Sequence, residues 1–176
     1  MKMNKLWAVC VMVMGVVFPA VNEVNGEAGK VTFTGTIVDA PCSLTSDSSQ
    51  QEVKLGHITQ NELKDQGSSK PRPFGIQLEN CDITAVGKVV SITFDGSAAG
   101  SGTTANLLGI PGVRGAGIAI TDANGNRIAL GQKTSLLKLV QGDNRLYFSA
   151  YLQGLASAAV VPGEFSSIAD FVIDYQ

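Results

Sequence analysis

The sequence predicts an all-β fold of the sandwich type. Apolar and polar residues alternate strictly at both ends of the chain, which is the pattern of strands with one buried face. Between the ends, short alternating runs are separated by turn residues, and few segments keep the period of a helix. Several short strands in one domain indicate two packed sheets. The expected strands are residues 30–39, 51–55, 74–80, 89–94, 117–121, 127–130, 144–153 and 166–175.

The first and last strands carry the clearest alternation. One face of the first strand collects Val31, Phe33, Gly35 and Ile37. One face of the last strand collects Phe165, Ala169, Phe171, Ile173 and Tyr175. Each end therefore needs an apolar groove and a neighbouring strand with which to pair. If that neighbour lies on another copy of the chain, the protein is a building block and not a catalyst.

Between the end strands, the strongest local signal is a hairpin at residues 122–126. Asn124-Gly125 supplies the positive φ of tight turns that match strand twist. The glycine-rich stretch 97–117, which Pro111 interrupts, is expected to be a loop with at most one short strand. Residues 58–66 are compatible with one or two helical turns. No internal repeat and no linker divides the chain.

The first 26 residues are expected to be a cleaved signal peptide. Lys2 and Lys5 precede an apolar run at positions 6–18, which is shorter than the roughly 20 residues of a membrane-spanning helix. An anchored helix is the alternative. Cleavage before Glu27 fits the rule of small residues before the cut, with Ala20 as a competing site. The remaining 150 residues suit one domain.

Export also accounts for the cysteines. Cys10 lies in the predicted signal peptide and leaves Cys42 and Cys81 as an even pair, which is expected to form a disulfide in an oxidising compartment. For a loop of this length, chain entropy gives about 4 kcal/mol of stabilisation. Two cysteines without nearby histidines make a poor zinc site.

Charge and aromatic content argue against binding to nucleic acid or to a membrane surface. Without Lys2, Lys5 and Glu23, the 13 basic and 15 acidic residues become 11 and 14, a net charge of −3. Such a balance attracts neither nucleic acid nor an anionic bilayer. Aromatic residues are few and basic residues are scattered, so no stacking platform is expected.

Motifs for catalysis are also missing. His57 is the only histidine, and a lone histidine is interpreted as structural. Glu62 and Asp65 are three residues apart and are interpreted as solvated charge, not as an acid/base pair. A group of glycines lacks the Lys-Ser/Thr of a phosphate-binding loop: Gly109, Gly112, Gly115 and Gly117. We therefore expect no enzyme activity, no cofactor, no metal and no small-molecule substrate.

The segment from Gly29 to Cys42 resembles the amino-terminal extension and first strand of chaperone–usher pilus subunits, most closely the major rod subunits of P-pilus type. Ser69-Lys70-Pro71 with residues 74–80, and Cys81-Asp82-Ile83-Thr84, match the same family. So does the last strand, with Gly163 fourteenth from the end and Tyr175 penultimate. The resemblance covers nearly the whole mature chain and is weakest over residues 86–117.

The resemblance implies an incomplete immunoglobulin-like sandwich, a six-stranded pilin fold that lacks its seventh strand and is completed by donor-strand exchange. Residues 27–38 then form a donor-strand extension and residues 39–176 the pilin domain. Val31, Phe33 and Ile37 would fill pockets of a neighbouring subunit, each contributing about 1.5 to 3 kcal/mol. Gly35 would stand where a side chain does not fit, and a strand bulge is the alternative explanation for it.

The family also implies roles at the carboxyl end. Residues of the last strand would line the groove beside the donor: Gly163, Phe165, Phe171, Ile173 and Tyr175. A periplasmic chaperone would grip this strand and the terminal carboxylate of Gln176, and an outer-membrane usher would exchange the chaperone for the next subunit. Because each subunit donates at one end and accepts at the other, a filament results.

The expected function is that of a structural subunit of an adhesive pilus, which forms the shaft at the cell surface and supports cell adhesion. Tip adhesins of the family carry an additional binding domain, for which the mature chain has no room. A minor adaptor or a terminating subunit is an alternative. Others are a self-contained secreted immunoglobulin-like binding module, which would be a stable monomer, and an exported hydrolase built around His57.

Overall fold

The computed structural model describes residues 29–84, 89–156 and 159–176. The predicted signal peptide, residues 1–26, lies outside them. The chain divides into two units between Ile37 and Val38, so that residues 29–37 are the described part of the first unit and Val38–Gln176 form the second. Within the described part, no helix is long and apolar enough to cross a bilayer.

Residues 29–37 contain neither helix nor strand, and all their side chains are exposed. The predicted strand at residues 30–39 is therefore wrong for the single chain. A strand is defined by the ladder that it shares with a neighbour, and these residues share none. The apolar side chains of the predicted inward face are exposed at 74 % for Val31, 90 % for Phe33 and 102 % for Ile37. We call residues 29–37 the extension.

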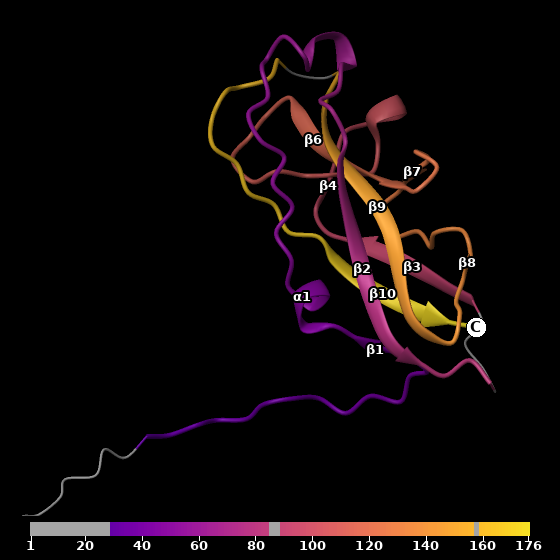
Figure 1. The fold of residues 1–176 in the computed structure, drawn as a ribbon. Helices are drawn as coiled ribbons and strands as arrows, with labels where there is room; N and C mark the ends of the chain where they lie inside the picture. Colours follow the sequence, from indigo (N-terminus) through magenta and orange to yellow (C-terminus); the bar gives the residue numbers. More distant parts are fainter. Residues whose placement is uncertain (1–28, 85–88, 157–158) are drawn as a thin grey trace, which may run out of the picture. The chain divides into compact units, whose positions relative to one another are not determined.

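The second unit folds as two antiparallel sheets (Figure 1). The larger sheet has the strand order β1-β2-β9-β6-β5-β4, with β7 beside β6, and the smaller has the order β10-β3-β8. The strands are β1 Ser43–Leu44, β2 Arg72–Cys81, β3 Val89–Asp95, β4 Ala98–Ala99, β5 Leu107–Leu108, β6 Ala116–Asp122, β7 Arg127–Ile128, β8 Leu137–Lys138, β9 Gly142–Gly154 and β10 Asp170–Tyr175. The helical turns are α1 Ser46–Ser49, η1 Lys64–Gln66 and η2 Gly102–Thr104.

The facing sides of the two sheets form the core. Alternate residues of β3, β2 and β9 are buried there, as the period of a half-buried strand requires. Aromatic rings occupy its centre, with the centroids of Phe94 and Phe148 5.2 Å apart and those of Phe74 and Phe148 5.6 Å apart. Phe171 of β10 joins them at 6.3 Å from Phe94. β10 therefore contacts the core through its inward face and pairs with β3 along one edge.

The all-β prediction is confirmed, and the long strands β2, β3, β6 and β9 begin and end within two residues of the expected bounds. The two-residue strands β1, β4, β5 and β8 were not expected, because two residues are too few to show a period. The predicted helical turns at 58–66 reduce to η1 and the turn before it. The structure also places two short strands and η2 in the stretch 97–117, where at most one strand was expected.

The predicted hairpin forms between β6 and β7, with the pairs Ile120↔Ile128 and Thr121↔Arg127. Only Gly125 of the Asn-Gly pair has a positive φ, of 83°. The Asp122 carboxylate accepts hydrogen bonds from the backbone N–H groups of Asn124 and Asn126 and from the Asn126 side chain. The turn therefore belongs to the three-residue class, which needs glycine at one position.

Candidate functional site

Two extended segments of the second unit have no strand partner. Residues 50–58 follow α1, and residues 162–169 precede β10; within the described residues neither segment makes a backbone–backbone hydrogen bond. Figure 1 shows them running side by side along the sandwich, the first in purple and the second in yellow. Unpaired backbone groups at a sheet edge are a template for another strand. We call residues 50–58 the first wall and residues 162–169 the second wall.

A groove lies between the two walls. Its part near α1 has a volume of about 500 Å³, and its part between residues 51–58 and 163–168 has about 740 Å³. The two parts share Val53, Leu55 and Ser167, so they form one continuous trough. The apolar residues on its floor and sides come from both sheets and both walls: Val53, Leu55, Phe74, Phe94, Leu108, Ile118, Ile120, Ala150, Ala169 and Phe171.

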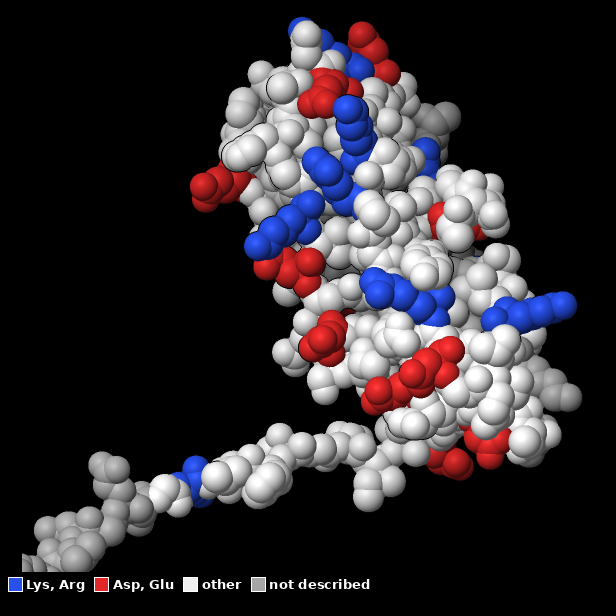
Figure 2. Space-filling view, viewed as in Figure 1, with Lys and Arg blue, Asp and Glu red and all other residues white. Residues whose placement is uncertain are grey.

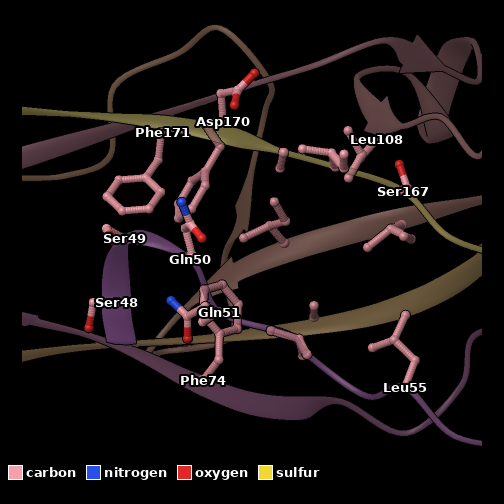
Figure 3. Close-up of a pocket in the computed structure, with 17 residues that line it drawn as sticks. Ser48, Ser49, Gln50, Gln51, Leu55, Phe74, Leu108, Ser167, Asp170 and Phe171 are labelled. Carbon is pink, nitrogen blue, oxygen red and sulfur yellow. The ribbon is translucent and has the colours of Figure 1, made fainter. Parts of the chain in front are cut away.

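One end of the groove is polar. Figure 3 shows Ser48 and Ser49 of α1 with Gln50 and Gln51 on one side, and Asp170 with Phe171 of β10 on the other. Ser48 is buried, and its hydroxyl accepts a hydrogen bond from the Gln77 N–H at 2.8 Å, which fixes α1 to β2. The groove is therefore apolar along its floor and bounded by polar groups where it opens beside α1.

The second wall and β10 keep the predicted alternation without a break. Phe165, Ala169, Phe171, Ile173 and Tyr175 are all half-buried, whereas Ser166 and Ile168 on the opposite face of the second wall are exposed. Gly163 lines the groove at its far end. The predicted strand 166–175 is a ladder only from residue 170, because residues 166–169 have no neighbour to pair with. Burial raises the pKa of the Tyr175 hydroxyl.

The carboxyl terminus is held in place by the ladder of the smaller sheet. β10 pairs with β3 from Asp170↔Asp95 to Tyr175↔Val90. Gln176 continues this pairing, because its N–H donates to the Val89 carbonyl at 2.9 Å and its carbonyl accepts from the Val89 N–H at 3.2 Å. The backbone of Gln176 is thus held at a defined position, and Gln176 itself is exposed.

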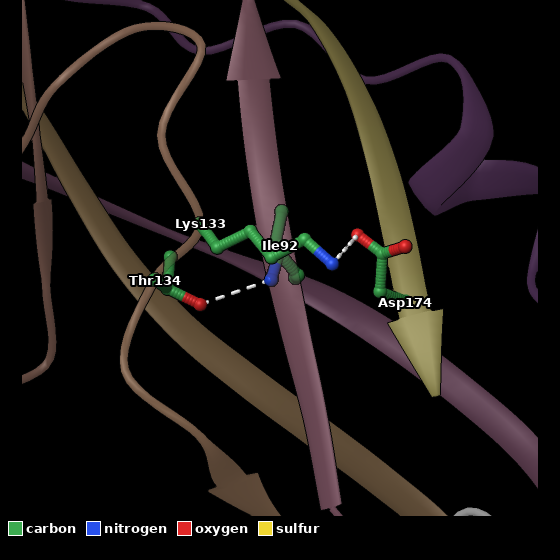
Figure 4. Close-up of polar contacts among 4 residues, drawn as sticks. All are labelled: Ile92, Lys133, Thr134 and Asp174. Atoms are coloured by element: carbon green, nitrogen blue, oxygen red, sulfur yellow. Dashed lines mark hydrogen bonds and ion pairs between the residues drawn. The ribbon is translucent and has the colours of Figure 1, made fainter. Parts of the chain in front are cut away.

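The other edge of β3 is closed by the loop that leads to β8. Thr134 donates its N–H to the Ile92 carbonyl at 2.8 Å, and its hydroxyl accepts from the Ile92 N–H at 2.9 Å. Lys133 reaches over β3 to Asp174 of β10, with Nζ 3.4 Å from Oδ2 (Figure 4). In the smaller sheet, the outer strands are therefore β10 and β8, and β10 continues the second wall.

The predicted disulfide between Cys42 and Cys81 is confirmed. Both residues are buried in the core cluster that β2, β3 and β9 share. Cys42 directly precedes β1, and Cys81 ends β2. The bond therefore ties the chain that follows the extension to one of the longest strands of the domain.

The polar residues considered above for catalysis, His57, Glu62 and Asp65, are all exposed. His57 is exposed at the rim of the groove, and within the described residues no cluster of His, Cys, Asp and Glu can hold a metal ion. Glu62 accepts hydrogen bonds from the N–H and hydroxyl of Thr59, while Thr59 caps Glu62 in return. These bonds from Thr59 lower the pKa of the Glu62 carboxyl. Glu62 is therefore a capping residue.

The glycines of the stretch 109–117 serve turns and close packing. Gly112 and Gly115 have positive φ values of 76° and 79°, and a Cβ at Gly115 would meet the Ala159 backbone. On the face of the molecule in Figure 2, Lys and Arg side chains are interspersed with Asp and Glu side chains. Neither feature indicates a phosphate or nucleic-acid site.

Sequence reasoning missed part of the groove. The first wall was expected to be an ordinary strand at residues 51–55, yet it is extended without a partner, with Val53 and Leu55 turned inward. Their alternation with Lys54 was visible, but alternation does not reveal whether a partner strand is present. Ser167 was also missed, because a polar residue does not stand out on an apolar face.

Comparisons with known proteins agree on one group. The family model described as "Fimbrial protein" matches residues 31–176. The "Fimbria A protein" of Serratia marcescens is 49% identical over 178 residues, covering 100% of both chains. A chain of a solved chaperone–usher pilus has a TM-score of 0.75 at 34% identity, covering 85% of this chain and 96% of that one. The P pilus rod subunit PapA has a TM-score of 0.70 at 31% identity, covering 78% and 100%.

Proposed function

Because the chain belongs to the fimbrial protein family, as a structural subunit of a surface pilus of the chaperone–usher type, we propose that it polymerises by donor-strand exchange through its own extension and groove. The extension of one subunit is the donor, and the groove between the first and second walls of the next is the acceptor. The observation that carries the proposal is that one chain has both an unpaired alternating segment and a groove with two unpaired edges.

The energetics favour such an exchange. Val31, Phe33 and Ile37 are almost fully exposed, and burying each in an apolar groove contributes about 1.5 to 3 kcal/mol. The backbone of the donor would also satisfy N–H and C=O groups along both walls. Strand addition of this kind draws affinity from backbone hydrogen bonds and specificity from alternate side chains. Gly35, between Phe33 and Ile37, is an inward position of the donor without a side chain.

The contact joins different surfaces of the two copies, so it does not close on itself. A head-to-tail contact of this type produces an open filament. The disulfide would hold the base of each donor to β2 of its own domain. The chain therefore serves as a shaft subunit that donates at one end and accepts at the other, and it acts as a structural part of the pilus without catalysis.

The exposed groove also calls for a partner before assembly. An open edge beside an apolar trough is an aggregation hazard, and a periplasmic chaperone that lends a strand would cover it. We assign recognition to β10, with Phe171, Ile173 and Tyr175 turned inward and the carboxylate of Gln176 held by the ladder at its end. An outer-membrane usher would then replace the chaperone by the extension of the next subunit.

The proposal is tested by co-expressing the mature chain with its pilus chaperone, releasing it, and running unheated denaturing gels. The intact chain should give a ladder of resistant multimers, whereas a chain without residues 27–37 should give a monomer. Both chains should carry the disulfide, which controls for folding. A monomer from the intact chain, with the groove filled by its own residues, would contradict donor-strand exchange and favour a self-contained module.

A further inference from the structure

The turn between β6 and β7 carries the one Asn-Gly pair of residues 27–176 (Figure 1). Asn124 and Gly125 are both exposed. The Asn126 side chain is held by the Asp122 carboxylate, to which it donates at 3.0 Å. The Asn124 side chain, in contrast, has no hydrogen bond or ion pair within the part of the chain that the structure describes. Its amide is therefore free to rotate toward the backbone of the next residue.

We propose that Asn124 is a site of spontaneous deamidation, in which the turn itself supplies the nucleophile. The backbone nitrogen of Gly125 loses its proton to water and attacks Cγ of Asn124. The side-chain nitrogen takes up a proton and leaves as ammonia, so that a cyclic succinimide joins the two residues. Water then opens the ring at either carbonyl carbon, which gives aspartate or isoaspartate at this position. The inference does not depend on donor-strand exchange and concerns the subunit after export.

Glycine at position 125 makes the attack sterically possible. It has no Cβ beside the attacking nitrogen, and a Cβ built there would meet nothing within 4 Å. The surroundings therefore leave room for the ring to close. Nucleophile and electrophile belong to adjacent residues, so a rotation of the Asn124 side chain brings them together without any diffusion step.

One native contact opposes the reaction at the attacking atom. The Gly125 N–H donates to the Asp122 carbonyl at 3.0 Å, and this bond must open before the nitrogen attacks. The net contribution of one hydrogen bond corresponds to a factor of about two to ten in an equilibrium. The Asn124 N–H is also held, by Asp122 Oδ1 at 2.9 Å, but this bond leaves Cγ free. The folded turn therefore slows the reaction only modestly.

Two other pairs of residues resemble this one and lack one of its features. Asn126 lies in the same turn, but the next residue is Arg127, which has a Cβ beside its nitrogen. Asp95 precedes Gly96, whose N–H donates to Asp95 Oδ1 at 2.8 Å. A carboxylate has no leaving group comparable to ammonia, so ring closure there is slower. The Asn-Gly pair combines a free amide with an unhindered nitrogen.

The consequence of the reaction reaches the core. Isoaspartate routes the backbone through the former side chain and lengthens a turn whose geometry depends on its number of residues. The new carboxylate also lies beside that of Asp122, which is the acceptor for the N–H groups of the turn. The pair Ile120↔Ile128 then loosens. Ile128 is buried in the core and Ile120 lines the groove, so the converted subunit should be less stable.

The test uses filaments sheared from cells and incubated in mildly alkaline buffer made with oxygen-18 water. Digestion with trypsin in ordinary water releases residues 115–127, and fragmentation in the mass spectrometer separates Asn124 from Asn126. Residue 124 should gain one labelled oxygen and yield isoaspartate, at least about tenfold faster than residue 126. The rate should be about two to ten times below that of a synthetic peptide of the same residues.

Two variants check the mechanism. Gly125→Ala should slow the conversion by about tenfold, because its Cβ hinders the attack. Alanine is strained at a φ of 83°, so the same change is also measured in the peptide, where no turn has to form. Asn124→Gln keeps the amide but requires a larger ring, and it should abolish the conversion. Incubation should lower the melting temperature of the unchanged filaments by about 2 to 4 °C and leave that of Asn124→Gln filaments unchanged.

Three results would overturn the proposal. The first is equal conversion of Asn124 and Asn126. The second is a peptide rate that Gly125→Ala leaves unchanged, which would remove the glycine nitrogen as the nucleophile. The third is protection of the filament by more than about a hundredfold relative to the peptide, because one hydrogen bond cannot supply that factor. If Gly125→Ala filaments fail to form, the peptide rates and Asn124→Gln still decide.

Discussion

Replacing Phe33 by alanine should weaken each junction of the filament, and replacing its neighbour Thr34 should not. Phe33 is 90 % exposed in the single chain, so nearly all of its ring surface is available for burial by another subunit. Burying a phenylalanine contributes up to about 3 kcal/mol, and alanine keeps only Cβ, so the loss is about 2 kcal/mol or a factor of about 30 in the binding constant. Thr34 lies on the opposite face of the donor, and its change should stay within about 0.5 kcal/mol.

A competition between peptides measures this factor directly. The chain without residues 27–37 is refolded with equimolar pairs of peptides that span residues 27–39, and the captured peptide is quantified by mass spectrometry. The unchanged peptide should outcompete the Phe33→Ala peptide by about 30 to 1 and should share the groove about equally with the Thr34→Ala peptide. Equal capture of the Phe33→Ala peptide, or discrimination against Thr34→Ala as strong as that, would refute the two-faced donor.

Three further changes test other parts of the molecule. Replacing both Cys42 and Cys81 by alanine should lower the free energy of unfolding of the peptide-filled domain by about 4 kcal/mol in denaturant titrations, because the disulfide closes a loop of 39 residues. An unchanged denaturation midpoint would mean that packing alone holds the start of the domain against β2. Replacing both Phe171 and Tyr175 by alanine should reduce chaperone capture and periplasmic yield. Val172→Ala is the control, because Val172 faces outward at 61 % exposure, and it should leave both quantities unchanged. Equal yields for the unchanged chain and both variants would show that β10 is not the recognition element. Hydrogen bonds, first from the Asn126 side chain, lower the pKa of the Asp122 carboxyl below 3.8, so its contribution to stability is complete above that pH and is lost as the pH falls through the lowered value. Asp122→Ala should therefore destabilise the domain at pH 6, and the difference from the unchanged chain should shrink below pH 3.8; a difference that persists at low pH would assign the effect to the backbone of the turn.

Alternation of apolar residues was enough to find the long strands. β9 keeps a side-chain period of two over thirteen residues, and β2 keeps it as far as Leu78, where a register shift before Cys81 interrupts it. The two-residue strands β4 and β5 carry no such signal, because tertiary contacts position them. The signal peptide and the number of cysteines were likewise enough to predict the disulfide, because the prediction needs only an even pair of cysteines and an oxidising compartment.

The walls of the groove show where sequence reasoning stops. Residues 51–55 and 166–169 have the alternation of strands and the extended backbone of strands, yet neither is hydrogen-bonded as one. The alternation of apolar residues correctly predicted that these segments have one inward face. It could not show whether a neighbouring strand is present, because the proposed partner strand belongs to another molecule.

The closed edge of β3 has a consequence for the material that these subunits make. Thr134 and Lys133 occupy that side of β3, and Pro73, which has no N–H, lies on the edge of β2 that faces away from β9, as does Gln77 four residues later. Under the proposed donor-strand exchange, the chain is a bifunctional monomer in the sense of polymer chemistry, with one donor end and one acceptor end. Monomers of functionality two yield threads that neither branch nor cross-link, so the length of the product is set by supply and termination.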